Sequence, residues 1–94
     1  APDKEKFPAL SLTYEALEKG GNMPCIMNAA NEAAVAAFLR EEIGFYDITD
    51  IVGECMAGAD FAADPSLDEI FETNELTLAR AAELIRKTAG RRSL

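Results

Sequence analysis

Carboxylates are the first candidates for chemistry in this sequence, and they gather in one segment. Residues 41–75 contain eleven acids and no base. Those that could suggest a calcium loop are Asp60, Asp64, Asp68, Glu69 and Glu72. A helix-loop-helix calcium site needs acids at alternate positions, a glycine at the sixth position and a glutamate at the twelfth. Counted from Asp60, these positions hold Ala62, Pro65 and Phe71, so the spacing argues against calcium.

A pair of carboxylates could also act as a general acid and base. Asp68 and Glu72 are four residues apart and would share one helix face. No apolar neighbours surround them to favour a protonated carboxyl, and no nucleophile is in register, so we interpret them as a solvated acidic face. The sequence has no histidine and no Gly-rich phosphate loop, GxSxG, GxGxxG or HExxH motif. We therefore assign no catalytic, cofactor-binding or metal-binding residue.

The more informative polar group is Asn28, Asn31 and Glu32, within an otherwise apolar stretch. An asparagine buried without a hydrogen-bond partner costs about 1–3 kcal/mol, so each amide must find a partner or face solvent. One interpretation is structural, with Asn28 as a helix N-cap and Asn31 bonded to a neighbouring loop. The other is that the three residues form a docking surface for another domain.

Composition narrows the class of protein. The 94 residues include 9 bases and 17 acids, a net charge of −8. Nucleic acid is not expected as a partner, because phosphate contacts need clustered Lys and Arg. The longest uncharged stretch, residues 20–31, is too short for a membrane span, and no signal peptide is expected at the charged N-terminus. Cys25 and Cys55 form no CxxC pair, so we expect reduced, packed cysteines and a cytoplasmic protein.

Apolar residues recur at helical spacing along most of the chain. A first helix is predicted after Phe7-Pro8, ending at Gly20-Gly21, and a second after Pro24, ending at Gly44. Asp47 is the predicted N-cap of a third. Residues 66–69 read as a capping box that opens a short turn through Phe71. Asn74 is predicted to cap a last helix that ends at Gly90.

These elements predict an all-α fold, a small four-helix bundle with short connecting turns. The alanine-rich second helix should be central, because it is apolar nearly all round. The side chains predicted to be largely buried are those of Leu10, Tyr14, Phe38, Ile48, Ile51, Val52, Leu78 and Ile85.

Several segments, taken in order, carry a resemblance to a known family. Residues 7–12 read FPALSL, 14–17 YEAL, 28–39 NAANEAAVAAFL, 43–48 IGFYDI and 66–70 SLDEI. Together they resemble the C-terminal domain of 1-deoxy-D-xylulose 5-phosphate (DXP) reductoisomerase, an enzyme of non-mevalonate isoprenoid biosynthesis. The stretch from Asn28 to Glu32 is the distinctive one. Ala9 and Ser11 depart from the family's usual Cys and base.

The resemblance implies that this chain is part of a larger enzyme. The family enzyme isomerises and reduces DXP to 2-C-methyl-D-erythritol 4-phosphate, with NADPH and a divalent metal, Mg²⁺ or Mn²⁺. Its cofactor, metal and substrate residues belong to the domains that precede this one, and the full enzyme is expected to be a homodimer. The resemblance thus implies a helical domain that supports the catalytic domain of the same polypeptide and is not catalytic alone.

The division expected from the resemblance is an end of the interdomain linker at residues 1–8, the helical domain at 9–90 and a frayed tail at 91–94. Two alternatives remain open. The chain could be a free-standing acidic helical module that binds a protein through Asn28, Asn31 and Glu32 or through its acids. It could also be a small metal-dependent enzyme built on the acidic cluster.

Overall fold

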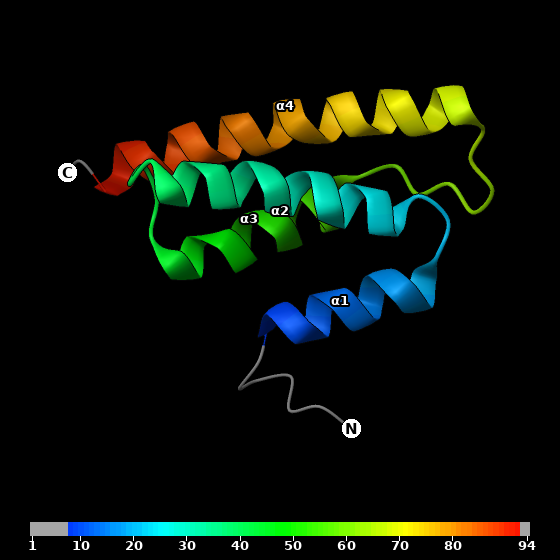
Figure 1. The fold of residues 1–94 in the computed structure, drawn as a ribbon, viewed down its shortest axis with the longest axis horizontal. Coiled ribbons are helices and arrows are strands. Elements are labelled where there is room, and N and C mark those ends of the chain that lie inside the picture. The colour runs from blue at the N-terminus through cyan, green and yellow to red at the C-terminus, as the bar shows by residue number, and fades with distance from the viewer. Residues whose placement is uncertain (1–7, 93–94) are drawn as a thin grey trace.

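The computed structural model describes residues 8–92, and the side chains of residues 11–91. Its elements are α1 (Pro8–Lys19), α2 (Met23–Leu39), α3 (Phe45–Gly58) and α4 (Leu67–Arg92), and the described chain contains no strand. The predicted all-α, four-helix architecture is confirmed. In Figure 1, α4 runs along one side and α1 along the other, with α2 and α3 between them.

Helix α2 is the centre of the domain, as its composition predicts. It packs against α1, α3 and α4. Its buried side chains are mostly alanines, including Ala30, Ala34 and Ala37, with Ile26 among them. Side chains this small let three neighbouring backbones approach one helix closely, at the cost of burying little apolar area per residue.

The beginning of α2 differs from the prediction. Gly20 and Gly21 have positive φ and end α1 as expected, because glycine has no Cβ to strain the left-handed backbone. Helix α2 then begins at Met23 with Asn22 as its N-cap, so Asn28 lies inside the helix and its prediction as an N-cap is wrong. Pro24 sits in the first turn, where its missing N–H would have no helical partner in any case.

The end of α2 is also earlier than Gly44. The backbone N–H of Glu42 donates to the carbonyl of Ala37 (3.0 Å), and that of Glu41 donates to Phe38 (2.9 Å). This is a Schellman motif, which normally has glycine at the left-handed position. Here Glu41 occupies that position with φ 63°, so no glycine marks the end of the helix in the sequence.

Helix α3 begins two residues before its predicted cap. Gly44 is the N-cap, and its N–H donates to Oδ2 of Asp47 over 2.7 Å. Asp47 therefore stabilises the helix start from inside the first turn, where a negative charge also favours the helix dipole.

Helix α4 is one continuous helix of 26 residues. The predicted capping box is present, because Glu69 N–H donates to Ser66 Oγ and Ser66 N–H donates to Glu69 Oε1, both over 3.1 Å. The predicted break at Phe71, new start at Asn74 and end at Gly90 are wrong. A single Asn or Gly costs a helix about 1 kcal/mol or less, too little to interrupt one packed along its length.

The core agrees with the sequence on α3 and less well on α4. Ile51, Val52 and Ile85 are buried, while Phe38 and Ile48 are half-buried against the core. Tyr14 and Leu78 are exposed, contrary to prediction. The inner face of α4 consists instead of Thr77, Ala81, Leu84 and Ile85. The side chain of Leu10 lies outside the described residues.

Candidate functional site

The polar group singled out in the sequence lies on the outer face of α2. Asn28, Asn31 and Glu32 are all exposed. The same face continues through half-buried Val35 to exposed Leu39, at the spacing of successive helical turns. Within the described chain, the side chains of Asn28 and Asn31 make no hydrogen bond to another residue, and neither is buried. The interpretation of Asn31 as bonded to a neighbouring loop is therefore wrong.

Two of these residues border a small cavity of about 140 Å³ between α1, α2 and α3. Asn28 and Asn31 lie on its α2 side, and Thr13 and Thr49 are its other polar residues. The apolar lining comes from Leu12, Met27, Ile48 and Val52. Glu32 shares the helix face but does not line the cavity. The cavity thus combines four polar side chains with four apolar ones.

The asparagine that the fold does bury is Asn22, which the sequence interpretation missed. Its side chain is 1% exposed. Nδ2 donates to the carbonyl of Asp60 (2.9 Å), and Oδ1 accepts from the N–H of Ala62 (2.9 Å). The backbone N–H of Asn22 donates to the carbonyl of Ala62, also over 2.9 Å. One residue thus holds the loop between α3 and α4 against the start of α2.

Two neighbours complete this junction. A Cβ on Gly21 would strike the backbone of Ala62, so the loop passes where only glycine leaves room. The ammonium of Lys19 lies 5.3 Å from the ring centroid of Phe61, a cation–π geometry. The Gly-Gly-Asn run was the available signal in the sequence, but it points to a tight turn and not to its partner.

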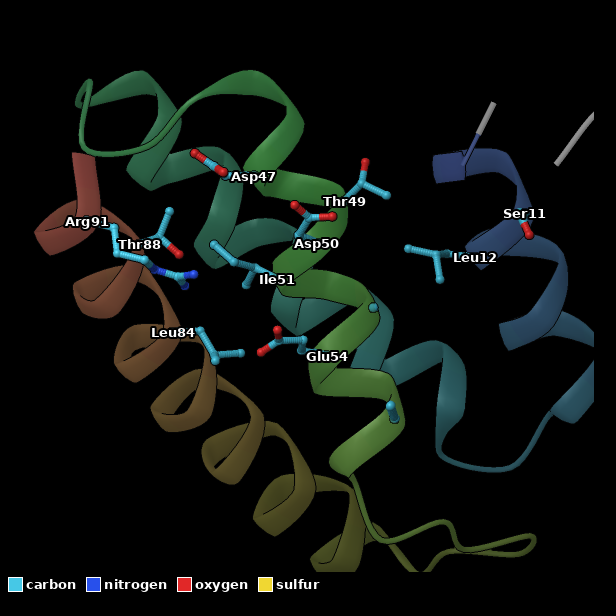
Figure 2. A pocket seen from close by; sticks show the side chains of 12 residues that line it. Ser11, Leu12, Asp47, Thr49, Asp50, Ile51, Glu54, Leu84, Thr88 and Arg91 are labelled. Atoms are coloured by element: carbon cyan, nitrogen blue, oxygen red, sulfur yellow. The ribbon is translucent and has the colours of Figure 1, made fainter. Parts of the chain in front are cut away.

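An open groove of about 680 Å³ runs along α3. Figure 2 shows Asp47, Asp50 and Glu54 of α3 within it, with Thr88 and Arg91 from α4. Ser11 and Leu12 of α1 lie on the opposite side of the groove. Three carboxylates against one guanidinium make the groove electronegative, which disfavours phosphate-bearing ligands.

The described residues contain no set of side chains that could bind a metal ion. No three His, Cys, Asp or Glu side chains among these residues lie close enough together to hold a metal ion. Asp68 and Glu72 are exposed on α4, and Glu69 is engaged by Ser66, whose backbone N–H lowers the pKa of the carboxyl. Among residues 8–92, no helix has the length and apolarity needed to cross a bilayer.

The two cysteines are free, as expected. Cys55 is buried between α3 and its neighbours, and burial raises the pKa of its thiol. Cys25 is half-buried on α2. A raised thiol pKa lowers the thiolate fraction and hence reactivity, so Cys55 packs as a small apolar side chain.

Comparison with known proteins identifies the domain. The family model of the DXP reductoisomerase C-terminal domain matches residues 1–81. The chain belongs to this family. A curated DXP reductoisomerase of Bacteroides thetaiotaomicron is 49% identical over 84 residues, which are 89% of this chain and 22% of the relative. The solved Zymomonas mobilis enzyme, in complex with NADPH, is 46% identical with a TM-score of 0.80, over 90% of this chain and 22% of that one.

The chain therefore spans about a fifth of the length of the DXP reductoisomerases that it matches. The DXP reductoisomerase resemblance drawn from the ordered segments, of which Asn28–Glu32 is the distinctive one, is confirmed at the level of the family. The structure places that stretch on the outer face of the central helix and brings Asn28 and Asn31 to one cavity.

Proposed function

We propose that this chain is the C-terminal domain of a full-length DXP reductoisomerase and has no catalytic activity alone. The full-length protein would isomerise and reduce 1-deoxy-D-xylulose 5-phosphate to 2-C-methyl-D-erythritol 4-phosphate, using NADPH and Mg²⁺ or Mn²⁺, in the cytoplasm and as a homodimer. The single observation that supports this most strongly is the family match over residues 1–81, in relatives about four times as long as this chain.

The residues of this domain do not fit either cofactor. The open groove along α3 is lined by Asp47, Asp50 and Glu54, which would repel the phosphates of NADPH. The described acids and cysteines do not gather into a set that could hold a divalent ion. We therefore derive no step of the reaction in this domain, and the proposal has both groups bound by the preceding part of the protein.

The role proposed for this domain is structural support of that preceding part. Asn28, Asn31 and Glu32 would contact it, because a helix that is otherwise apolar carries three exposed polar side chains on one face. An amide can donate and accept hydrogen bonds at once, and the cavity beside Asn28 and Asn31 could take one apolar side chain. The domain division stays as predicted from the sequence, with the addition that α4 extends helically to Arg92.

A chimaera tests this function directly. In the B. thetaiotaomicron enzyme, residues 1–94 of this chain replace the matching C-terminal region. We expect DXP-dependent NADPH oxidation by the chimaera and none by the 94-residue chain, whose folding is checked first by circular dichroism. Activity in the isolated chain would contradict the proposal. A folded chimaera without activity would favour the free-standing interaction module.

The docking residues are tested in the same chimaera. Asn31→Ala removes an exposed amide on α2, and Asn74→Ala removes an exposed amide on α4. Loss of a buried interface hydrogen bond costs about 1–3 kcal/mol. We therefore expect Asn31→Ala to lower the midpoint of urea unfolding and Asn74→Ala to leave it unchanged. Equal effects of the two substitutions would argue against this docking face.

A further inference from the structure

Four large side chains gather where α2 turns into α3, and we call this cluster the aromatic turn: Phe38, Leu39, Phe45 and Tyr46. Leu39, Phe45 and Tyr46 are exposed and Phe38 is half-buried. The Phe38 and Phe45 ring centroids are 5.9 Å apart, and those of Phe45 and Tyr46 are 5.7 Å apart. Both pairs meet edge to face, the arrangement that aromatic quadrupoles favour.

The turn between the helices leaves Leu39, Phe45 and Tyr46 exposed. The Schellman motif ends α2 directly after Leu39, and the Gly44–Asp47 cap starts α3 at Phe45. Both caps are hydrogen-bonded within the segment itself. The exposed aromatic side chains are therefore presented by an ordered backbone.

A small domain loses hydrophobic stabilisation when several large apolar side chains stay exposed. Three of the seven aromatic residues of the chain lie in the nine residues from Phe38 to Tyr46. Contiguous exposed apolar surface marks an interaction site, and Phe and Tyr are enriched at the centres of interfaces. Leu39 also continues the outer face of α2 that carries Asn28 and Glu32, so the aromatic turn extends the docking face already proposed.

The position of the start of α1 favours one binding partner for the aromatic turn. The family match is to a C-terminal domain, so the remaining four-fifths of a relative lies before it in sequence. That part would join this fold at the start of α1. Leu12 and Thr13 of α1 line a cavity together with Ile48 and Thr49 of α3, one turn beyond Phe45. The preceding part would thus reach the domain beside the first half of α3, the helix that begins in the aromatic turn.

We infer that the aromatic turn docks against an apolar patch on the part of the reductoisomerase that precedes this domain, with Phe45 at its centre. This inference rests on the proposed function. A second copy of this chain would be the alternative occupant, and a concentration-dependent measurement separates the two.

The test is hydroxyl-radical labelling of the full-length protein that carries this sequence. Phe45 and Phe71 provide a matched pair, because they are 66% and 63% exposed in the domain alone. We expect Phe45 to be labelled roughly fivefold or more slowly than Phe71, as for an aromatic residue at the centre of an interface. Tyr46 and Leu39 should also be protected from labelling, and the protection of all three residues should persist when the protein is diluted.

Each outcome decides one question. If the full-length protein turns over DXP but labels Phe45 as fast as Phe71, the docking inference is wrong and the proposed function stands. If protection disappears on dilution, the occupant is a second copy and the inference is overturned. A full-length protein without DXP-dependent NADPH oxidation would remove the proposed function itself, whatever the labelling pattern.

A matched pair of variants supplies an independent readout. Phe45→Ala and Phe71→Ala remove the same side chain from equally exposed positions. In the full-length protein, Phe45→Ala should raise the rate of proteolytic release of the C-terminal domain by roughly tenfold or more. Phe71→Ala should leave that rate unchanged. Equal rates for the two variants would contradict the inference.

Discussion

The amide of Asn22 donates to the carbonyl of Asp60 across 38 residues of sequence, over 2.9 Å. With the second bond from Ala62 N–H to Oδ1, it fixes the loop between α3 and α4 against the start of α2. The loop and the α1–α2 turn lie at the same end of the domain in Figure 1. The Asn22 side chain thus satisfies two backbone groups of a loop that is distant in sequence.

Asn22→Ala should be strongly destabilising. The substitution leaves the Asp60 carbonyl and the Ala62 N–H without these partners, and we expect a loss of about 2–4 kcal/mol in the free energy of unfolding. Urea denaturation followed by circular dichroism measures it. Asn74→Ala, at an exposed helical position, serves as the control and should cause no loss. A loss below about 1 kcal/mol for Asn22→Ala would show that water replaces these bonds.

Gly20 and Gly21 should respond differently to alanine. Both have positive φ, 68° and 55°, so each alanine carries a strain of about 1 kcal/mol. A Cβ on Gly20 meets open space, whereas one on Gly21 strikes the backbone of Ala62. We expect Gly21→Ala to lower the unfolding midpoint well beyond Gly20→Ala. Equal midpoints would mean that the loop moves away freely.

The inner face of α4 is tested by one substitution at two positions. Leu84 is 8% exposed and Leu78 is 38% exposed. Leu84→Ala should cost about 2–5 kcal/mol, as for other buried leucines, and Leu78→Ala less than about 1 kcal/mol. Thermal unfolding of both variants measures the difference. A larger loss for Leu78→Ala than for Leu84→Ala would support the sequence prediction that Leu78 is buried.

The capping box should make the start of α4 sensitive to acid. The Glu69 carboxylate accepts from the Ser66 backbone N–H, and then from the Ser66 hydroxyl, and both bonds lower its pKa. A lowered folded-state pKa contributes stability above the pKa of the unfolded chain, and this contribution is lost as the pH falls through the lowered value. An NMR titration of the Glu69 carboxyl should give a pKa below the ordinary one. Ser66→Ala removes the hydroxyl but keeps the backbone N–H, so it should bring the pKa only part of the way back. An ordinary Glu69 pKa in the unaltered chain would contradict the assignment.

The sequence predicts local features of this fold well, because their partners are close in the chain. The Ser66–Glu69 box is an i, i+3 relationship, and the stripe of Ile51 and Val52 follows one uninterrupted helical period. The junction at Asn22 could not be predicted in this way, since nothing near it in sequence indicates Asp60 or Ala62.

The errors on α4 and α2 have specific causes. Thr77 is polar but buried, with its hydroxyl satisfied by the carbonyl of Thr73 over 2.7 Å. A prediction based on apolar residue type therefore places Leu78 in the core, where the fold has Thr77. The end of α2 depends on Glu41 in a glycine conformation, which no residue type indicates. The sequence left open whether Asn28 and Asn31 are bonded within the fold or form a docking surface. The structure shows that both are exposed, and their contact with another domain stays a prediction.

The central helix also sets how this domain can vary. The buried positions of α2 that touch three neighbours are filled mainly by Ala30, Ala34 and Ala37. Truncation to glycine costs about 1 kcal/mol of helix propensity, whereas any added methyl group must displace a neighbouring helix. In a library of all single substitutions, the least tolerant positions of this helix would therefore be its smallest residues. Added side-chain volume, and not lost apolar area, would then limit which substitutions the centre of this domain accepts.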